Sequence, residues 1–394
     1  MKKIFFVALG ATLLAASCQK TEIINQVPGE SMTFTTAMSK LTKAVGESDA
    51  DKVDGMDNLK AQDFKVWAFC AYEDAINDVN FGDVYDEMEA LDVTFETTWT
   101  TTKDYYWPGT DKSLDFFAVS TGHDWAVAEV KNEAGEVITP AVAGVSVDIE
   151  GEGLTPAART MTISGYAVDA NDPNDDLMVA EFVRQHQGMN GKKVSMHFKH
   201  ALAKVQFRFT TNAGTDAIKV KSLSVADLNT VGKLTVSEVE KSYVESNGRV
   251  SVSLAWTEPA TPAVFNDDYD GDLLLKAPEE VTGEDGQVTV KKNDQEFATW
   301  LVLPQDIKGK TVTIEYDITS ETGTREFTQT FALTRPAVAE VKDGDTVVTP
   351  GKEAFASWDI NQVVIYTINL SPNKITFEPS VEPWNPDTNH EDQN

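Results

Sequence analysis

The chain has 394 residues with 63 acidic and 33 basic side chains, and its formal net charge is -30. This excess of carboxylates repels phosphates, which argues against nucleic acid as a partner. The length fits two domains, or one large sandwich with insertions. The composition, 41% hydrophobic and 24% charged, is typical of a folded soluble protein, and its two cysteines are too few for a disulfide framework.

Residues 1–17 are predicted to be a lipoprotein signal peptide. Two lysines precede an apolar run over residues 4–16, which has the layout of a secretory signal and is too short to span a bilayer. Small residues then lead directly to Cys18, and this arrangement resembles the lipobox of bacterial lipoproteins, in which the cysteine is acylated. An ordinary secretory signal with a cysteine at its cleavage site is the alternative. Residues 18–30 are predicted to be a polar leash.

Most apolar segments after residue 30 alternate with polar residues, which is the pattern of half-buried antiparallel strands. A mainly β fold is therefore predicted. A boundary near Gly188 and Gly191 would divide the chain into two domains, residues 31–190 and 191–384, each with about seven to ten strands. Examples of the alternation, in chain order, are Met32, Phe34 and Thr36; Phe64, Val66 and Ala68; Val194, Met196 and Phe198; and Val312, Ile314 and Tyr316.

Helical periodicity is scarce in the sequence. Residues 84–92 and 177–187 are predicted to form short helical insertions of two or three turns. Charged, turn-rich loops are predicted between the strands, among them residues 46–63 and 265–272. The last ten residues, 385–394, are predicted to be a free polar tail.

The residues that could carry chemistry form no complete catalytic or metal-binding motif. His197 and His200 are three apart on a predicted strand, so they point to opposite faces and cannot share a metal ion without a bulge. The aspartates of residues 267–272 could offer oxygens to calcium, but the glutamate that closes a calcium-binding helical hand is absent, which favours a solvated turn. Cys70 lies on a predicted strand, where a free thiol packs as a small apolar group. No catalytic residue, cofactor or metal is predicted.

Four aromatic residues lie close together in the sequence and could stack on sugar rings. They are Trp99, Tyr105, Tyr106 and Trp107. Core packing is the favoured interpretation for them. With 63 carboxylates, a two-carboxylate hydrolase is not excluded by composition, but no pair is singled out.

Several segments, in a fixed order along nearly the whole chain, are similar to those of one protein family, the fimbrillins. Fimbrillins are the subunits of pili that Gram-negative anaerobes assemble from lipoprotein precursors. The segments are CQK at 18–20, MTFTTA at 32–37, TKA at 42–44, YWP at 106–108, LDFFA at 114–118, DLMVA at 176–180, MHFKHALAKV at 196–205, LVLPQ at 301–305, ITF at 375–377 and VEPW at 381–384.

The resemblance implies two transthyretin-like β-sandwich domains, the second beginning near Lys192, and a mechanism of assembly. A trypsin-like protease would remove a leader strand, residues 31–43, whose alternating side chains are Met32, Phe34 and Thr36. The implied scissile bond joins Lys43 to Ala44. Family sites usually carry arginine at this point, and Lys40 and Lys52 are the alternatives.

The groove left by the leader strand would accept a donor strand from a neighbouring subunit. The implied donor comes from the C-terminal strands, residues 363–370 and 374–381, in which Ile375, Phe377 and Val381 share one alternating face.

The predicted function is therefore a structural pilus subunit that supports adhesion. Its implied partners are other copies of itself or related fimbrillins, an outer-membrane lipid anchor through Cys18, the processing protease, and a host glycan or protein. Its implied location is the outer membrane and the surface fimbria. A pilus-tip or surface glycan-binding adhesin is one alternative and would need no leader cleavage. A secreted carbohydrate-active enzyme is another, for which no motif is present.

Overall fold

The computed structural model of the chain is nearly all β. It describes residues 31–38, 55–71, 85, 88–107, 113–132, 137–150, 159–169, 175–186, 189, 193–211, 217–240, 242–244, 246–257, 262–275, 279–282, 288–291, 295–343, 346–349, 351–371 and 374–384. Within these residues there are 29 strands and one α-helix, α1 (Gly55–Gln62). The prediction of a mainly β fold is confirmed. Residues 1–30, Lys43, Ala44 and the tail 385–394 lie outside the described residues.

A nine-stranded sheet forms the centre of the first sandwich. Its main path runs β1-β12-β10-β5-β2-β3-β4, and β11 and β16 extend it from β5. Its strands are β1 (Thr33–Met38), β2 (Phe64–Ala71), β3 (Leu91–Phe95), β4 (Trp99–Thr101), β5 (Ser113–Ser120), β10 (Met178–Ala180), β11 (Phe182–His186), β12 (Lys193–His200) and β16 (Arg249–Val250).

Both faces of this sheet are buried, and β5 is buried along its whole length. One face, which carries Trp67 and Phe117, shares an apolar core with a second sheet of order β17-β15-β9-β8. The opposite face, with Phe116 and Phe198, encloses a separate core together with β1 and Leu59 of α1. The strands of the second sheet are β8 (Ser146–Glu150), β9 (Thr160–Ser164), β15 (Lys233–Glu238) and β17 (Val252–Thr257).

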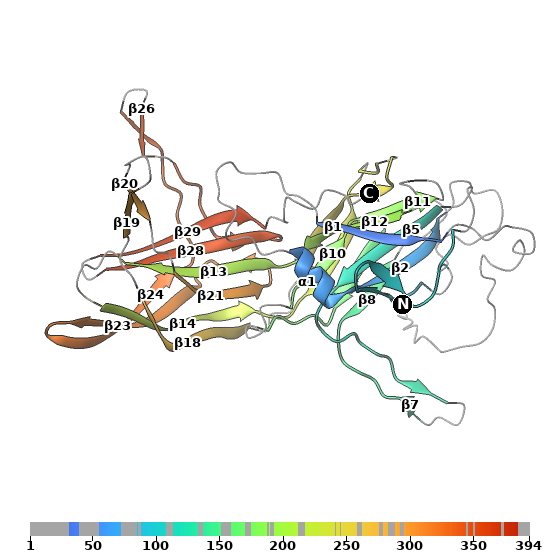
Figure 1. Cartoon of the computed structure of the whole chain (residues 1–394), viewed down its shortest axis with the longest axis horizontal. Helices are drawn as coiled ribbons and strands as arrows, with labels where there is room; N and C mark the ends of the chain where they lie inside the picture. Colours follow the sequence, from blue (N-terminus) through green and yellow to red (C-terminus); the bar gives the residue numbers. More distant parts are fainter. Residues whose placement is uncertain are drawn as a thin grey trace, which may run out of the picture.

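Two four-stranded sheets form the second sandwich, which lies beside the first along the long axis of the molecule (Figure 1). Their orders are β21-β13-β28-β29 and β18-β14-β23-β24. Between them pack the rings of Phe207, Trp300 and Tyr366. The strands are β13 (Ala203–Thr210), β14 (Ala217–Asn229), β18 (Pro262–Leu274), β21 (Gln295–Val302), β23 (Thr311–Ser320), β24 (Gly323–Ala332), β28 (Gln362–Ser371) and β29 (Lys374–Pro383).

Four two-stranded ladders complete the fold, and the one that holds β7 projects from the body (Figure 1). The pairs are β6 (Val130–Lys131) with β7 (Val137–Thr139), β19 (Glu279–Thr282) with β20 (Val288–Lys291), β22 (Gln305–Asp306) with β27 (Ser357–Trp358), and β25 (Val341–Asp343) with β26 (Thr346–Thr349).

The predicted positions of the helical insertions are wrong. Residues 177–187 hold β10 and β11, whose side chains are mostly buried on both faces, and such a continuous apolar run cannot be told from a helix by its period. In the described part of residues 84–92 there is no helical turn, and β3 begins at Leu91. The helix lies instead in the predicted loop 46–63, where Asp57 and Lys60 sit at the ends of α1 that favour their charges. The predicted loop 265–272 lies within β18.

The strand pairings do not follow the predicted domain boundary, because a later part of the chain returns to the first sandwich. The step from the first sandwich to the second falls at Ala201 and Leu202, between β12 and β13. Residues 233–257 then return to the first sandwich, because β15 pairs with β9 and β16 pairs with β11. A single cut at residue 190 does not describe these pairings. The sheets are antiparallel except that β1 runs parallel to β12 and β13 runs parallel to β28.

Candidate functional site

The predicted leader strand forms β1, at the edge of the nine-stranded sheet. A parallel ladder joins it to β12, with register Thr33 to Lys193 at one end and Met38 to Phe198 at the other. On its opposite side it lies beside β4, and the backbone N–H of Met32 donates to the carbonyl of Tyr105 at 2.7 Å. One ladder therefore carries most of the backbone pairing of this strand.

The inward side chains of β1 are part of the core that they cover. The ring of Phe34 packs edge-on against Phe64 and Phe116, with centroids 6.4 and 6.2 Å apart. Met32 and Met38 are buried on the same face. Thr36 is half-buried, and its Oγ1 accepts a hydrogen bond from Trp99 Nε1 at 2.8 Å. The strand thus seals an apolar core with four alternating side chains.

The predicted donor residues lie on β29, which is an edge strand of the second sandwich and pairs with β28 in antiparallel register. Phe377 stacks on Tyr366 at 5.0 Å and on Phe331 at 5.4 Å between ring centroids. Ile375 is half-buried against the same core, whereas Val381 is 45% exposed. The side chains of this strand are therefore held less deeply than those of β1.

A buried cluster joins the end of β29 to the first sandwich, and we call it the histidine joint: Asp176, His200 and Trp384. His200 Nδ1 lies 2.5 Å from Asp176 Oδ2, and both side chains are almost completely buried. The indole of Trp384 lies flat on the imidazole of His200, with centroids 3.7 Å apart and planes 7° from parallel. Because a buried carboxylate needs a partner, the pairing with Asp176 fixes the plane on which Trp384 stacks.

Backbone hydrogen bonds hold the histidine joint in place. The N–H of Trp384 donates to the carbonyl of Asn361 at 3.3 Å, and the N–H of Asn361 donates to the carbonyl of Leu202 at 2.9 Å. Ala201 donates to the carbonyl of Leu177 at 2.8 Å and accepts from the indole of Trp256 at 2.7 Å. The connection between the two sandwiches, Ala201 and Leu202, is therefore hydrogen-bonded to three other parts of the chain, at Leu177, Trp256 and Asn361, and Asn361 is in turn bonded to Trp384.

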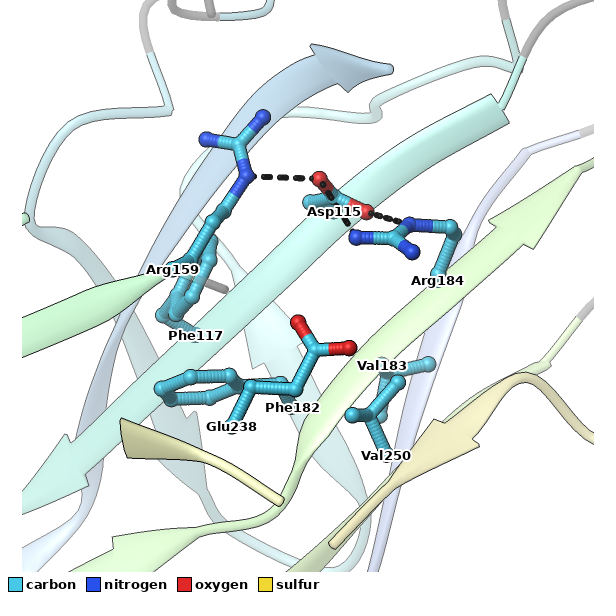
Figure 2. A pocket seen from close by; sticks show the side chains of 8 residues that line it. All are labelled: Asp115, Phe117, Arg159, Phe182, Val183, Arg184, Glu238 and Val250. Carbon is cyan, nitrogen blue, oxygen red and sulfur yellow. Dashed lines mark hydrogen bonds and ion pairs between the residues drawn. The ribbon is translucent and has the colours of Figure 1, made fainter. Parts of the chain in front are cut away.

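A second buried charged cluster lies in the first sandwich and lines one side of the pocket shown in Figure 2. Asp115 on β5 is paired with Arg159 Nε at 2.8 Å and with Arg184 Nε at 2.7 Å. Burial lowers the pKa of Arg159, and the attraction of Asp115 opposes that effect. The volume of the pocket, 10 Å³, is close to the minimum for one water molecule, so it is no site for a sugar or a cofactor.

Glu181 forms a third buried charged cluster. Its Oε2 accepts hydrogen bonds from Arg249 Nε at 3.0 Å and Nη2 at 2.5 Å, and its Oε1 lies 3.1 Å from Lys199 Nζ. Burial raises the pKa of the Glu181 carboxyl, but the hydrogen bonds and charges of Arg249 and Lys199 outweigh it, so the pKa is lowered overall. Stability from this group is present above the ordinary glutamate pKa and is lost as the pH falls through the lowered value.

We expect Glu181→Gln to reduce the free energy of unfolding by about 1.5–3 kcal/mol at pH 7, because Arg249 and Lys199 lose a charged acceptor. As the pH falls below the ordinary glutamate pKa and then through the lowered pKa of Glu181, its carboxyl becomes protonated and the difference between the two proteins shrinks. Urea unfolding of both proteins at several pH values measures this. If Glu181→Gln reduces the free energy of unfolding by the same amount at all pH values, a stabilising role for the charge of Glu181 is contradicted.

Most of the sequence candidates for chemistry are structural. Cys70 is buried in the core under β1. Tyr105 and Trp107 are buried and Trp99 is half-buried, which leaves only Tyr106 of the four aromatic candidates exposed, at 42%. Within the described residues, no three His, Cys, Asp or Glu side chains are arranged to hold a metal ion. Across the same described part of the chain, no helix has the length and apolar character that a membrane crossing requires.

Comparison with known proteins identifies the family. A family model described as "Fimbrillin-like" matches residues 52–384. The chain belongs to the fimbrillin-like family. This family is structural and adhesive rather than enzymatic, so the prediction that the chain is no enzyme is confirmed by its membership. No curated protein matches the chain.

Solved structures that match the chain come from Bacteroides and Parabacteroides species. A fimbrial protein of Bacteroides vulgatus is 16% identical, with a TM-score of 0.46, over 90% of this chain and 99% of the other. A candidate cell adhesion protein of Bacteroides uniformis is 14% identical, with a TM-score of 0.35, over 82% and 91%. A further candidate, from Parabacteroides distasonis, is 10% identical, with a TM-score of 0.38, over 92% and 99%. With TM-scores below 0.5, these likenesses add nothing to the family match.

The fimbrillin-like segments of the sequence meet in space at the histidine joint. Asp176 opens the segment 176–180, His200 lies in the segment 196–205, and Trp384 ends the segment 381–384. Sequence reasoning weighed His200 as a metal ligand and favoured a structural role, but it did not find the contacts of His200 with Asp176 and Trp384. It also missed Asp115, although a charge in the middle of a buried fimbrillin strand is itself a signal that a partner is required.

Proposed function

We propose that this fimbrillin is exported as a lipoprotein, anchored through acyl chains on Cys18, cut between Lys43 and Ala44, and polymerised by donor-strand exchange into a surface fimbria that supports adhesion. The observation that carries the proposal is β1: an edge strand, held mainly by one ladder, that seals an apolar core. A strand in that position can be removed without breaking the remaining pairings of the sheet.

Removal of β1 creates the driving force for assembly. It leaves the pairing edge of β12 open and the core around Phe64 and Phe116 uncovered. Unpaired backbone groups and exposed apolar surface are both unfavourable in water, so the groove captures a strand with matching alternation. Three apolar side chains that enter it at about 1.5–3 kcal/mol each give about 5–9 kcal/mol before the cost of ordering.

The donor in this proposal is β29 of a neighbouring copy. Ile375, Phe377 and Val381 lie on one face of an edge strand, so this strand can leave its sheet without passing through another strand. The net charge of -30 works against association of two copies through their polar surfaces. An apolar groove filled by a strand is a contact that this repulsion weakens least, which supports donor-strand exchange over a surface contact.

We expect a Lys43→Gln precursor to remain monomeric, because the leader strand stays in its groove. The measurement is the size distribution of surface-extracted protein, together with electron microscopy. Lys40→Gln and Lys52→Gln are matched controls that should still assemble. Filaments formed by Lys43→Gln with residues 31–43 retained would refute this scissile bond.

The lipid anchor has its own test. Cys18→Ser is expected to abolish incorporation of labelled palmitate and membrane association, since acyl chains provide the membrane affinity. Cys70→Ser is the matched control, because Cys70 is buried in the core and should leave labelling unchanged. Labelling of Cys18→Ser at the level of the unchanged chain contradicts the anchor.

A further inference from the structure

Trp384 is the deepest anchor of the C-terminal strand. It follows directly on β29 and is almost completely buried, whereas Ile375 and Phe377 are only half-buried and Val381 is 45% exposed. The ring of Trp384 is held from one side by the imidazole of His200 at 3.7 Å. The end of β29 therefore cannot leave its sheet until the indole of Trp384 leaves its buried place against His200.

The surface that holds Trp384 belongs to the strand that holds the leader strand. His200 is the last residue of β12, and Phe198, two residues earlier on the same face, is in register with Met38 of β1. On the other side β12 pairs with β10, in the register Met178 to His200, and Asp176 lies two residues before Met178. The histidine joint is therefore built on β12 and its neighbour β10.

Removal of β1 takes away one of the two ladders that hold β12, the strand that carries His200. With β1 in place, β12 is paired on both sides at Phe198. Without β1, the only strand of the described sheet that still pairs with β12 is β10, which has three residues. Phe198 also loses part of the core that β1 covers. The orientation of His200 then depends on Asp176, the short β10 ladder, and the backbone hydrogen bonds from Glu181 to His197 and from Ala201 to Leu177.

We infer that the histidine joint is a latch that keeps the C-terminal strand β29 in its own sheet while the leader strand is present and loosens when the leader strand is removed. This rests on the proposed donor role of β29. His200 acts as a positioning residue, oriented by Asp176, and Trp384 is the part that moves. Assembly would then follow a fixed sequence: β29 of a subunit becomes available as a donor only after the leader strand of the same subunit has been removed.

The test measures amide hydrogen exchange of residues 374–384 by mass spectrometry, on monomer isolated by size exclusion. It compares two chains, one that begins at Gln19 and one that begins at Ala44. In the longer chain, Trp384→Ala is expected to accelerate exchange at least tenfold, and Trp384→Phe, which can still stack on His200, should restore most of the protection. Val381→Ala is the matched control on the same strand and should leave exchange unchanged.

The chain that begins at Ala44 tests whether the leader strand and the histidine joint are coupled. There, residues 374–384 of the unchanged sequence are expected to exchange at least tenfold faster already, and Trp384→Ala should add less than threefold, because the latch is already loosened. Exchange of β13, in the same sheet, reports whether a variant remains folded. If Trp384→Ala unfolds the chain, Asp176→Asn takes its place in the same comparison.

Two results would overturn the inference. One is exchange of residues 374–384 that is the same in the two unchanged chains. The other is an acceleration by Trp384→Ala that is equally large in both. Neither depends on filaments: failure of the shorter chain to form fibres under the electron microscope contradicts the proposed function, whereas the exchange data on monomer decide the latch.

Discussion

A chain that begins at Ala44 is expected to lose about 5–9 kcal/mol of stability in its first sandwich when it is kept monomeric. Met32, Phe34 and Met38 leave a buried face, and each such side chain contributes about 1.5–3 kcal/mol. Because whole domains are stable by about 5–15 kcal/mol, this loss brings the sandwich close to unfolding or drives it to capture another strand. Urea unfolding of size-selected monomer, compared with the chain that begins at Gln19, measures the loss.

The groove itself can be tested by adding the missing strand back. A synthetic peptide of residues 31–38 should raise the unfolding midpoint of the shortened chain and suppress its polymerisation, since it restores the ladder with β12. The same peptide with Phe34→Asp is the control, because a carboxylate cannot enter the core between Phe64 and Phe116. If the chains that begin at Gln19 and at Ala44 are equally stable without peptide, β1 does not seal the core.

Asp115→Ala is expected to reduce the free energy of unfolding by about 3–5 kcal/mol. The substitution removes the carboxylate between Arg159 and Arg184, and two guanidinium groups are left close together with no compensating charge from β5. Thermal and urea unfolding measure the change. The triple variant Asp115→Leu, Arg159→Met and Arg184→Met is expected to recover most of the loss, because apolar groups of similar size can replace a buried ionic cluster.

An exposed ion pair supplies the matched control for Asp115. Asp306 Oδ2 and Lys308 Nζ are 3.2 Å apart, but both side chains are mostly exposed to solvent, so Lys308→Ala should leave the unfolding midpoint unchanged. This variant keeps the hydrogen bond from the backbone N–H of Lys308 to Asp306 Oδ1. If Asp115→Ala has as little effect as Lys308→Ala, the buried cluster does not stabilise the first sandwich.

Local patterns predicted the elements well where one face of a strand is buried. The alternation of Val312, Ile314 and Tyr316 is enough to identify β23, because the period of two is a local property of the backbone. It failed at residues 177–187, where the strands are covered on both sides and the apolar run has no period to report. It also missed α1, whose eight residues show only a weak apolar face.

The sequence by itself determined that the chain is mainly β, that the segments of one family occur in order along it, and that Phe34 and Phe377 belong to alternating apolar faces. Only the tertiary structure decided which strands are neighbours: that β1 runs parallel to β12, that β15 returns to β9, and that Asp176, His200 and Trp384 meet. The physical reason is that strand type depends on residues two positions apart, whereas strand pairing and the partners of a buried charge depend on residues tens to hundreds of positions away.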